Sequence, residues 1–276
     1  IPYYLINGEN LKISANIDDN LGVDTAYVSY NINEVEQPPF GLTIESGTTY
    51  TGIFNFNINT LKDGDVISYY IIAKDSSVAR NTKRLPYKFT FDFNTEEIFD
   101  PVSAYINDFN NPSNDFIIHD FDIYTPSGFT NSALQSPHPY TSTENSETNF
   151  NFSTILKHPI ILQDGGTMNY DEIVLVEPGE QLTEYGDENF WDYVIVEGSK
   201  DKGKSWLPLV DGYDSGLYSI WETKYNSYIV SQDSRATGTP SLYINHEIGL
   251  LDNGNFSAGD TILIRFRLFS DPFANG

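Results

Sequence analysis

The sequence contains no cysteine. The chain can therefore form neither disulfides nor thiolate metal sites, and it has no cysteine nucleophile. This absence fits an exported bacterial surface protein, which avoids cysteine mispairing during export, although many cytosolic proteins also lack cysteine. The chain also has no signal peptide and does not begin with methionine. We expect it to be a segment of a longer polypeptide whose targeting signal lies elsewhere.

Basic residues are scarce. Lys and Arg together number 15 against 39 Asp and Glu, which gives a net charge of −24 over 276 residues. Such a chain repels phosphate backbones and anionic lipid, so we expect no nucleic-acid partner. No run approaches the roughly 20 apolar residues of a membrane helix, and we expect no membrane insertion. Aromatic residues make up 14%, too many for a disordered acidic chain.

Catalytic motifs are missing as well. His246-Glu247 has no second histidine at the spacing of zinc peptidases. Residues 212–216 (GYDSG) have the wrong spacing for a nucleophile elbow, and there is no phosphate-binding glycine loop. An active site built from carboxylates alone stays open, because 39 acids allow many pairs. We predict that this chain is not itself an enzyme.

Alternation with a period of two dominates the sequence and predicts an all-β fold. We predict two tandem β-sandwiches: an immunoglobulin or fibronectin type III-like domain over 1–95 and a jelly roll over 96–276. The acidic stretch 94–100 (NTEEIFD) is expected to be the linker or the first turn of the next domain. No amphipathic stretch is long enough to predict a helix, and 132–135 is a helical turn at most.

The expected strands alternate with turns rich in Gly, Asn, Asp and Pro. In the first domain they cover 11–17, 25–32, 42–45, 50–57, 66–74 and 87–92. The run 85–93 around the last of these alternates through Tyr87, Phe89, Phe91 and Phe93. In the second domain the strongest cover 172–177, 191–197 and 261–269. The polar stretch 136–149 is predicted to be a long loop.

Two stretches of the first domain carry a family likeness. Residues 13–19 (ISANIDD) and 66–75 (VISYYIIAKD) resemble the opening and closing strands of the fibronectin type III or immunoglobulin-like spacers of bacterial surface proteins. The resemblance implies a domain that separates or presents its neighbours.

A sharper likeness covers most of 101–276, which resembles the MAM-like jelly-roll modules of exported proteins from Bacteroidetes. It rests on residues 173–180 (IVLVEPGE), 190–201 (FWDYVIVEGSKD), 204–209 (KSWLPL), 211–215 (DGYDS) and 264–271 (IRFRLFSD). Those modules occur in surface proteins and secreted peptidases that use type IX secretion. The resemblance implies a non-catalytic module outside the cell, some relatives binding calcium or sugar and others acting as spacers.

Calcium is the cofactor that the composition favours, because Ca²⁺ takes six to eight hard oxygen ligands. The richest candidate is 107–111 (NDFNN), where Asp108 would supply a charged ligand and Asn110 a neutral one. The alternative is a turn in which these side chains cap backbone groups.

A second acidic cluster precedes Trp191. It has five carboxylates within twelve positions: Glu177, Glu180, Glu184, Asp187 and Glu188. Such carboxylates repel one another unless they are solvated or share a cation, so Glu177 and Asp187 are candidate ligands and a solvated loop is the alternative. Weaker candidates are Asp201, Asp211 and Asp214 near Trp206, and 18–20 with Asp75 in the first domain.

Aromatic side chains offer a third possibility, because rings stack on the faces of sugars. Trp221 is expected to be the most exposed tryptophan, with Tyr218 beside it, and Tyr140 in the 138–140 turn is placed to line a groove. The alternative is that these rings fill a sandwich core.

We therefore expect an accessory or adhesion segment of a secreted or cell-surface, outer-membrane-associated bacterial protein. Its partners would be neighbouring domains of the same polypeptide, and further a glycan or another surface protein. Two alternatives stay open: a carbohydrate-binding module, and the C-terminal accessory region of a secreted peptidase.

Overall fold

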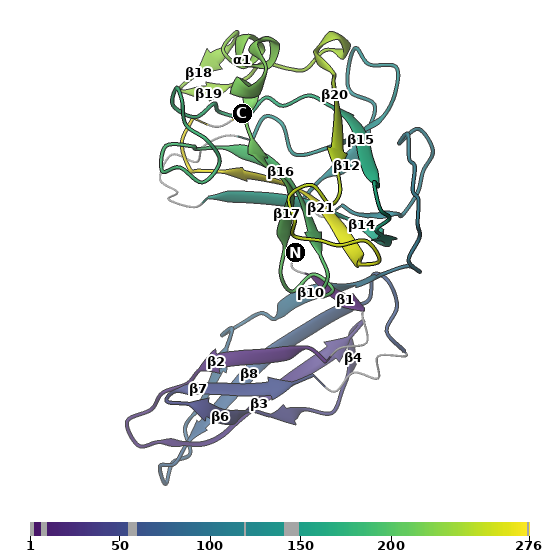
Figure 1. Cartoon of the computed structure of the whole chain (residues 1–276). Helices are drawn as coiled ribbons and strands as arrows, with labels where there is room; N and C mark the ends of the chain where they lie inside the picture. The colour runs from purple at the N-terminus through teal and green to yellow at the C-terminus, as the bar shows by residue number, and fades with distance from the viewer. Residues whose placement is uncertain (1–2, 7–9, 55–59, 119, 141–148, 275) are drawn as a thin grey trace. The chain divides into compact units, whose positions relative to one another are not determined.

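The structure is a computed structural model of the chain, and it describes residues 3–6, 10–54, 60–118, 120–140, 149–274 and 276 (Figure 1). The described chain is almost entirely β-structure. It divides into two compact units, Ile1–Ile98 and Phe99–Gly276. Each unit contains several multi-stranded sheets, in keeping with the predicted all-β sandwich fold class.

Two antiparallel sheets with one parallel edge pair build the first unit. The larger sheet has the order β1 (Tyr3–Ile6), β10 (Phe91–Glu97), β8 (Val66–Asp75), β3 (Val23–Ile32), β4 (Val35–Glu36), with β5 (Phe40–Gly41) on β3 and β9 (Thr82–Leu85) on β8. The smaller sheet has the order β2 (Lys12–Asn16), β7 (Thr49–Ile53), β6 (Thr43–Ser46). β1 and β10 run parallel, and the other pairs are antiparallel.

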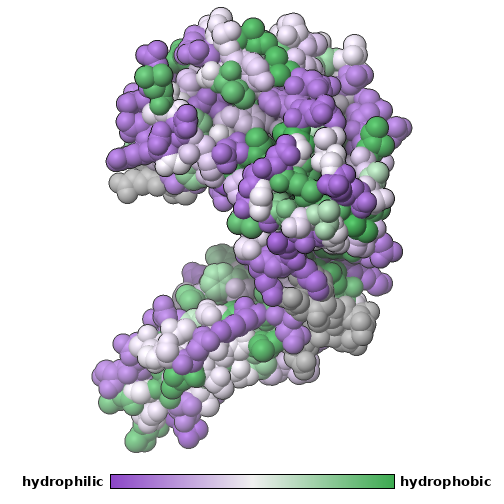
Figure 2. Space-filling model, viewed as in Figure 1, coloured by the Kyte–Doolittle hydropathy of each residue, from purple (hydrophilic) through white to green (hydrophobic). Residues whose placement is uncertain are grey.

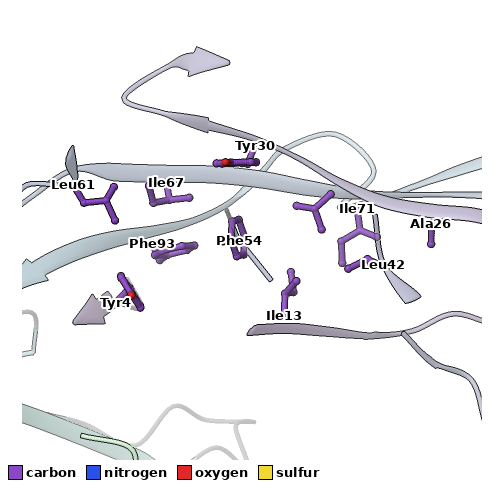
Figure 3. Packing of buried hydrophobic residues seen from close by; sticks show 11 residues of the cluster. Tyr4, Ile13, Ala26, Tyr30, Leu42, Phe54, Leu61, Ile67, Ile71 and Phe93 are labelled. Atoms are coloured by element: carbon purple, nitrogen blue, oxygen red, sulfur yellow. The ribbon is translucent and has the colours of Figure 1, made fainter. Parts of the chain in front are cut away.

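Phe54 lies at the centre of the first core (Figure 3). Its ring packs edge-on against Tyr30, Tyr69 and Phe93, with centroids 5.4–5.9 Å apart. Ile13 from the smaller sheet and Ile71 from the larger one also join this core. Alternation along β3 places Ala26, Val28 and Tyr30 on the core face, and alternation along β8 does the same for Ile67, Tyr69 and Ile71. Truncating a buried Phe of this kind costs about 3–5 kcal/mol.

The structure corrects two expectations near the end of the first unit. The alternating run does not form one strand, because β9 ends at Leu85 and β10 begins only at Phe91. Tyr87 and Phe89 in between are 81% and 78% exposed, so their rings do not join the core. Residues 94–97 belong to β10, paired with β1, and not to a linker; the division between the units falls after Ile98, whereas the prediction placed it after residue 95.

A five-stranded antiparallel sheet forms one layer of the second unit. Its order is β11 (Phe116–Ile117), β14 (Phe150–Ile161), β21 (Thr261–Ser270), β16 (Tyr193–Ser199), β17 (Leu207–Tyr213). Three strand pairs complete the described β-structure: β12 (Asp122–Tyr124) with β13 (Ala133–Gln135), β15 (Thr167–Glu172) with β20 (Ile244–Gly249), and β18 (Ile229–Val230) with β19 (Asp233–Ser234).

The inner face of the five-stranded sheet packs against β15 and β20. Leu156 of β14 and Ile264 of β21 share a core with the partly buried Met168 of β15 and Ile248 of β20. A second core gathers Val174, Val176 and Trp221. Both cores lie on the same face of the five-stranded sheet, because Val194 of the second core and Val196 of the first are two positions apart on β16.

Short helices appear where none was predicted. The described part of the second unit contains the 3₁₀ helices η2 (Ser215–Leu217) and η3 (Pro240–Leu242) and the α-helix α1 (Ser219–Tyr225). In α1, Trp221 and Tyr225 lie four residues apart and are both buried, so one face of the helix enters the core. Ala133–Gln135 is a strand and not a helical turn.

Two further predicted elements of the second unit differ in detail. The strand expected over 172–177 ends at Glu172, and the next residues have no ladder partner although Val174 and Val176 are both 2% exposed. Of the loop predicted over 136–149, residues 136–140 and 149 carry no helix or strand, and 141–148 lie outside the described residues.

Figure 2 shows hydrophilic residues over much of the face in view, with hydrophobic residues in small groups between them. Within the described part of the chain, no helix has the length and apolar character needed to cross a membrane.

Candidate metal centre

Three carboxylates meet in the second unit at the ends of core segments. Glu177 follows the buried residues Val174–Val176, Asp192 immediately precedes β16, and Asp271 immediately follows β21. Because β16 and β21 are antiparallel neighbours, the start of β16 and the end of β21 lie at the same end of the sheet. The strand ladder thus places Asp192 next to Asp271.

The three side chains come close enough to share one ion. One oxygen from each of Glu177, Asp192 and Asp271 lies within 4.8 Å of the other two. Asp192 is fully buried, and the other two are partly exposed. We call these three residues the acidic triad.

Hydrogen bonds fix Asp192 firmly. Its Oδ1 accepts from the backbone N–H of Asp271 at 3.0 Å, and its Oδ2 accepts from the Tyr140 hydroxyl at 3.2 Å. Ser270 also donates to it. Glu177 differs, because no hydrogen bond or ion pair from any described residue reaches its carboxylate.

A fourth carboxylate, Asp233 of β19, adds negative charge to this region. It is 3% exposed, and Arg235 Nη2 lies 3.6 Å from its Oδ2. Asp233 acts on the triad through its charge, because it raises the pKa of Glu177 together with Asp192 and Asp271.

Burial and mutual repulsion raise the free energy of the acidic triad when its carboxyl groups are ionised. Burial is the main cause that raises the pKa of Glu177 to about 8, and the three neighbouring carboxylates raise it further. Burial likewise raises the pKa of Asp192 to about 7, against the opposing effect of its hydrogen bonds. A bound cation would reverse this balance, because opposite charge within a few ångströms favours the ionised form.

The donor set fits calcium. All three triad ligands are hard carboxylate oxygens, and neither histidine nor cysteine is among them. Zinc and copper sites normally contain nitrogen or sulfur, whereas Ca²⁺ prefers oxygens and tolerates irregular geometry. Glu177, Asp192 and Asp271 would hold the ion, which would supply positive charge and cross-link the three segments.

Of the metal ligands that the sequence suggested, only Glu177 belongs to the acidic triad. Glu177 lies in the triad, but Asp187 does not: it is exposed, and its Oδ2 accepts from the backbone N–H of Glu184 at 2.9 Å to close a turn. Asp108 is also exposed and accepts from the N–H of Asn110 at 3.0 Å. The Asn110 side-chain oxygen accepts from the N–H of Ser132.

These contacts follow the alternative that the sequence left open, in which Asp and Asn cap turns. Asp75 and Asp201 do the same. Asp75 accepts from Ser77 and Asn81, and Asp201 accepts from Ser199 and Ser205. None of these four aspartates is part of the acidic triad.

The three aromatic candidates lie in or near the second core. Trp221 is 0% exposed and its indole N–H donates to the carbonyl of Leu242 at 2.7 Å, so the expectation that it is exposed is wrong. Tyr218 is half-buried and packs edge-on against Trp221. Tyr140 is 5% exposed and contacts the acidic triad through Asp192. Trp221 therefore presents no ring face for a sugar.

Asp192 and Asp271 were not singled out, and the reason is their separation of 79 positions. A signal was present nonetheless, since each is a lone acid beside a strongly apolar strand. Comparison with known proteins adds no relative, because no family model and no curated protein matches this chain.

Proposed function

We propose that this chain is a non-catalytic segment of a secreted or cell-surface bacterial protein that spaces or presents neighbouring domains, and that calcium stabilises its second unit. The observation that carries the calcium part is the acidic triad with its uncompensated Glu177 carboxylate. The spacer role is supported by two tandem sandwiches. The location outside the cell rests on the sequence resemblance.

A cation at the triad would act as a cross-link. It would tie the segment after Val176 to the start of β16 and the end of β21, which are distant in sequence. The chain has no disulfide that could serve this purpose, because it has no cysteine. Binding to the folded state alone adds stability in proportion to the logarithm of the ion concentration.

An extracellular setting suits such a site. Calcium sites of extracellular modules have dissociation constants of about 10⁻⁴–10⁻³ M, in keeping with the calcium available outside cells. A triad with one partly exposed glutamate and few neutral ligands belongs in this weak class.

Thermal unfolding of the whole chain tests the proposal. At a calcium concentration about 100 times the dissociation constant, the second unit gains about 2.7 kcal/mol over EDTA. For a unit of this size the melting temperature should rise by about 5–10 °C. Magnesium at equal concentration should give a smaller rise, because it demands a tighter octahedral shell. Identical melting curves in calcium and EDTA would refute the calcium part.

A further inference from the structure

Basic residues gather at one place in the first unit. Arg80, Lys83, Arg84 and Lys88 follow one another closely, and the stretch 76–91 around them contains neither Asp nor Glu. The whole chain has 15 basic residues for 39 acidic ones, so four bases without an acid stand apart from the rest of the sequence. The stretch covers the turn after β8, the strand β9 and the connection to β10.

No described acid neutralises this cluster. Arg80, Lys83 and Lys88 are exposed, and none of the four bases forms a salt bridge with a described carboxylate. The guanidinium of Arg84 lies 4.0 Å from the centroid of the Tyr70 ring and donates to the carbonyl oxygen of Pro86. In a chain with more than two acids for each base, this lack of partners indicates that the acids facing the cluster belong to another molecule.

Exposed apolar side chains alternate with these bases. Leu85 is 54% exposed, and the rings of Tyr87 and Phe89 are still more accessible. β9 pairs with β8 and with no other described strand, so its second edge is uncovered. We call residues 80–89 the basic–aromatic patch. Exposed ion pairs alone stabilise a complex little, whereas rings and aliphatic chains also gain from leaving water.

The second unit carries a surface of the opposite charge. Glu180, Glu184, Asp187 and Glu188 are exposed in one loop, and no described base pairs with them. The stretch 159–199 contains neither Lys nor Arg. None of these four carboxylates belongs to the acidic triad, so the calcium proposal does not use them. We call residues 180–188 the acidic loop.

The acidic loop has a fixed shape and an apolar side chain of its own. Asn189 Nδ2 donates to Glu180 Oε2 at 2.9 Å, and the Thr183 hydroxyl donates to the Glu180 carbonyl oxygen at 2.7 Å. Leu182 in the same loop is 95% exposed. A loop that its own hydrogen bonds hold in place loses less entropy when it binds a partner.

We propose that the basic–aromatic patch of one copy of this chain binds the acidic loop of a second copy. Four bases face four acids, and Leu182 contacts the rings of Tyr87 and Phe89. Two different surfaces meet, so the contact is heterologous and can continue from copy to copy. The negative net charge of each copy does not prevent this, because charges more than about 8 Å apart are largely screened at physiological ionic strength.

Self-association goes beyond the spacer role, because it would link copies of the polypeptide to which the segment belongs. Sedimentation equilibrium of the full chain tests it, in EDTA so that calcium plays no part. In about 0.15 M NaCl, the weight-average mass should rise between about 10 µM and 1 mM protein, as a weak contact requires. A mass that stays constant would overturn the proposal, also if the two surfaces meet within one copy. A monomeric chain that binds vesicles of anionic lipid would assign the patch to a membrane and overturn it too.

Single charge reversals test whether the patch is responsible. Lys88→Glu should weaken the association about fivefold or more, because a negative charge then faces the acidic loop. Lys62→Glu makes the same charge change at an exposed position before β8, outside the patch, and should leave the association unchanged. Equal weakening by both variants would mean that net charge governs the association, which would overturn the assignment to the patch.

Mixing two reversed chains gives the sharpest test. One chain carries Lys83→Glu with Lys88→Glu, and the other carries Glu184→Lys with Glu188→Lys. Each should associate far more weakly than the parent chain, because one of its two surfaces has lost its net charge. An equimolar mixture should associate again, since the unchanged acidic loop of the first chain meets the unchanged patch of the second. A mixture of folded chains that associates no more than its components would contradict the proposal.

Discussion

Two glutamates of the second unit, one buried and one partly exposed, have opposite electrostatic surroundings. Glu197 on β16 is 5% exposed, and β21 supplies it with two arginines: Arg265 Nη2 at 2.7 Å and Arg267 Nε at 2.8 Å. Glu177 has no such partner among the described residues and faces Asp192 and Asp271 instead. The chain neutralises the Glu197 carboxylate with its own arginines, whereas the Glu177 carboxylate faces other acids.

The same two strands deliver both arrangements. Arg265 and Arg267 alternate on β21 with a period of two, so both reach across to Glu197 on β16. At the end of the same β16–β21 strand pair, the carboxylates of Asp192 and Asp271 lie next to each other. The comparison teaches that an acid paired with arginine can be a fixed part of the core. Clustered acids are instead expected to make the free energy of unfolding depend on pH and on cation concentration.

The largest effect is expected at Glu197, the carboxylate that is paired with two arginines. Arg267→Met leaves Glu197 with one arginine and should lower the free energy of unfolding by about 3 kcal/mol, because it strands part of a buried charge. Urea denaturation should show the same loss in calcium and in EDTA.

The matched control is Lys12→Met in the exposed Lys12–Glu45 pair of the first unit, where both side chains are about half exposed. It should cost less than about 1 kcal/mol. A calcium-dependent loss in Arg267→Met would contradict the separation of the two charge clusters.

The next effect is expected at the acidic triad, where the change in the free energy of unfolding caused by one substitution should have opposite signs in calcium and in EDTA. In saturating calcium, Glu177→Gln should lower the free energy of unfolding by about 2–3 kcal/mol, since the ion no longer adds its stabilisation. In EDTA the same variant should be more stable than the parent chain, because it removes a repelling charge. Denaturation under both conditions measures this, and the same sign in both would refute the ion-sharing account.

Stability should also fall as the pH rises in EDTA. The pKa of Glu177 is raised to about 8 and that of Asp192 to about 7, so the folded state binds more protons than the unfolded state above pH 4–5. The linkage slope is then negative, and the stability present at pH 5 is lost as pH rises through 7 and 8.

Glu177→Gln should flatten this slope. Because Glu177 is partly exposed, we expect the difference between variant and parent at pH 8 to be about 1 kcal/mol. Calcium should flatten the parent's profile as well, since the ion favours the ionised carboxylates. A profile that rises from pH 5 to 8 in EDTA would contradict the raised pKa values.

The smallest effect is expected at Asp187, which the sequence suggested as a ligand. Asp187→Asn keeps an oxygen that accepts from the Glu184 N–H, so stability should stay within about 0.5 kcal/mol. Its calcium-induced rise in melting temperature should equal that of the parent chain. A lost calcium response in this variant would place the ion elsewhere.

The sequence predicts the β-strands better than it predicts the acidic triad. Strands such as Thr261–Ser270 are readable because their alternation and apolar content are local properties. The triad is not readable, because the pairing of β16 with β21 joins residues 79 positions apart. Glu177 stood out only through its acidic neighbours in sequence, and none of those neighbours belongs to the triad.

The wrong predictions of which aromatic side chains are buried have a similar origin. Trp221 and Tyr225 sit four apart in a helix of seven residues, too short for helical periodicity to show among strands. Tyr87 and Phe89 alternate like core residues but lie between β9 and β10, where no partner strand continues the ladder. In both cases the tertiary pairing, which one segment does not encode, decides which ring is covered.

Calorimetric titration of CaCl₂ into the metal-free chain tests the central claim most directly. One calcium ion should bind per chain with a dissociation constant of about 10⁻⁴–10⁻³ M, and the Glu177→Gln variant should give no binding heat. Folded protein that binds no calcium, or a variant that binds it as the parent does, would contradict the account.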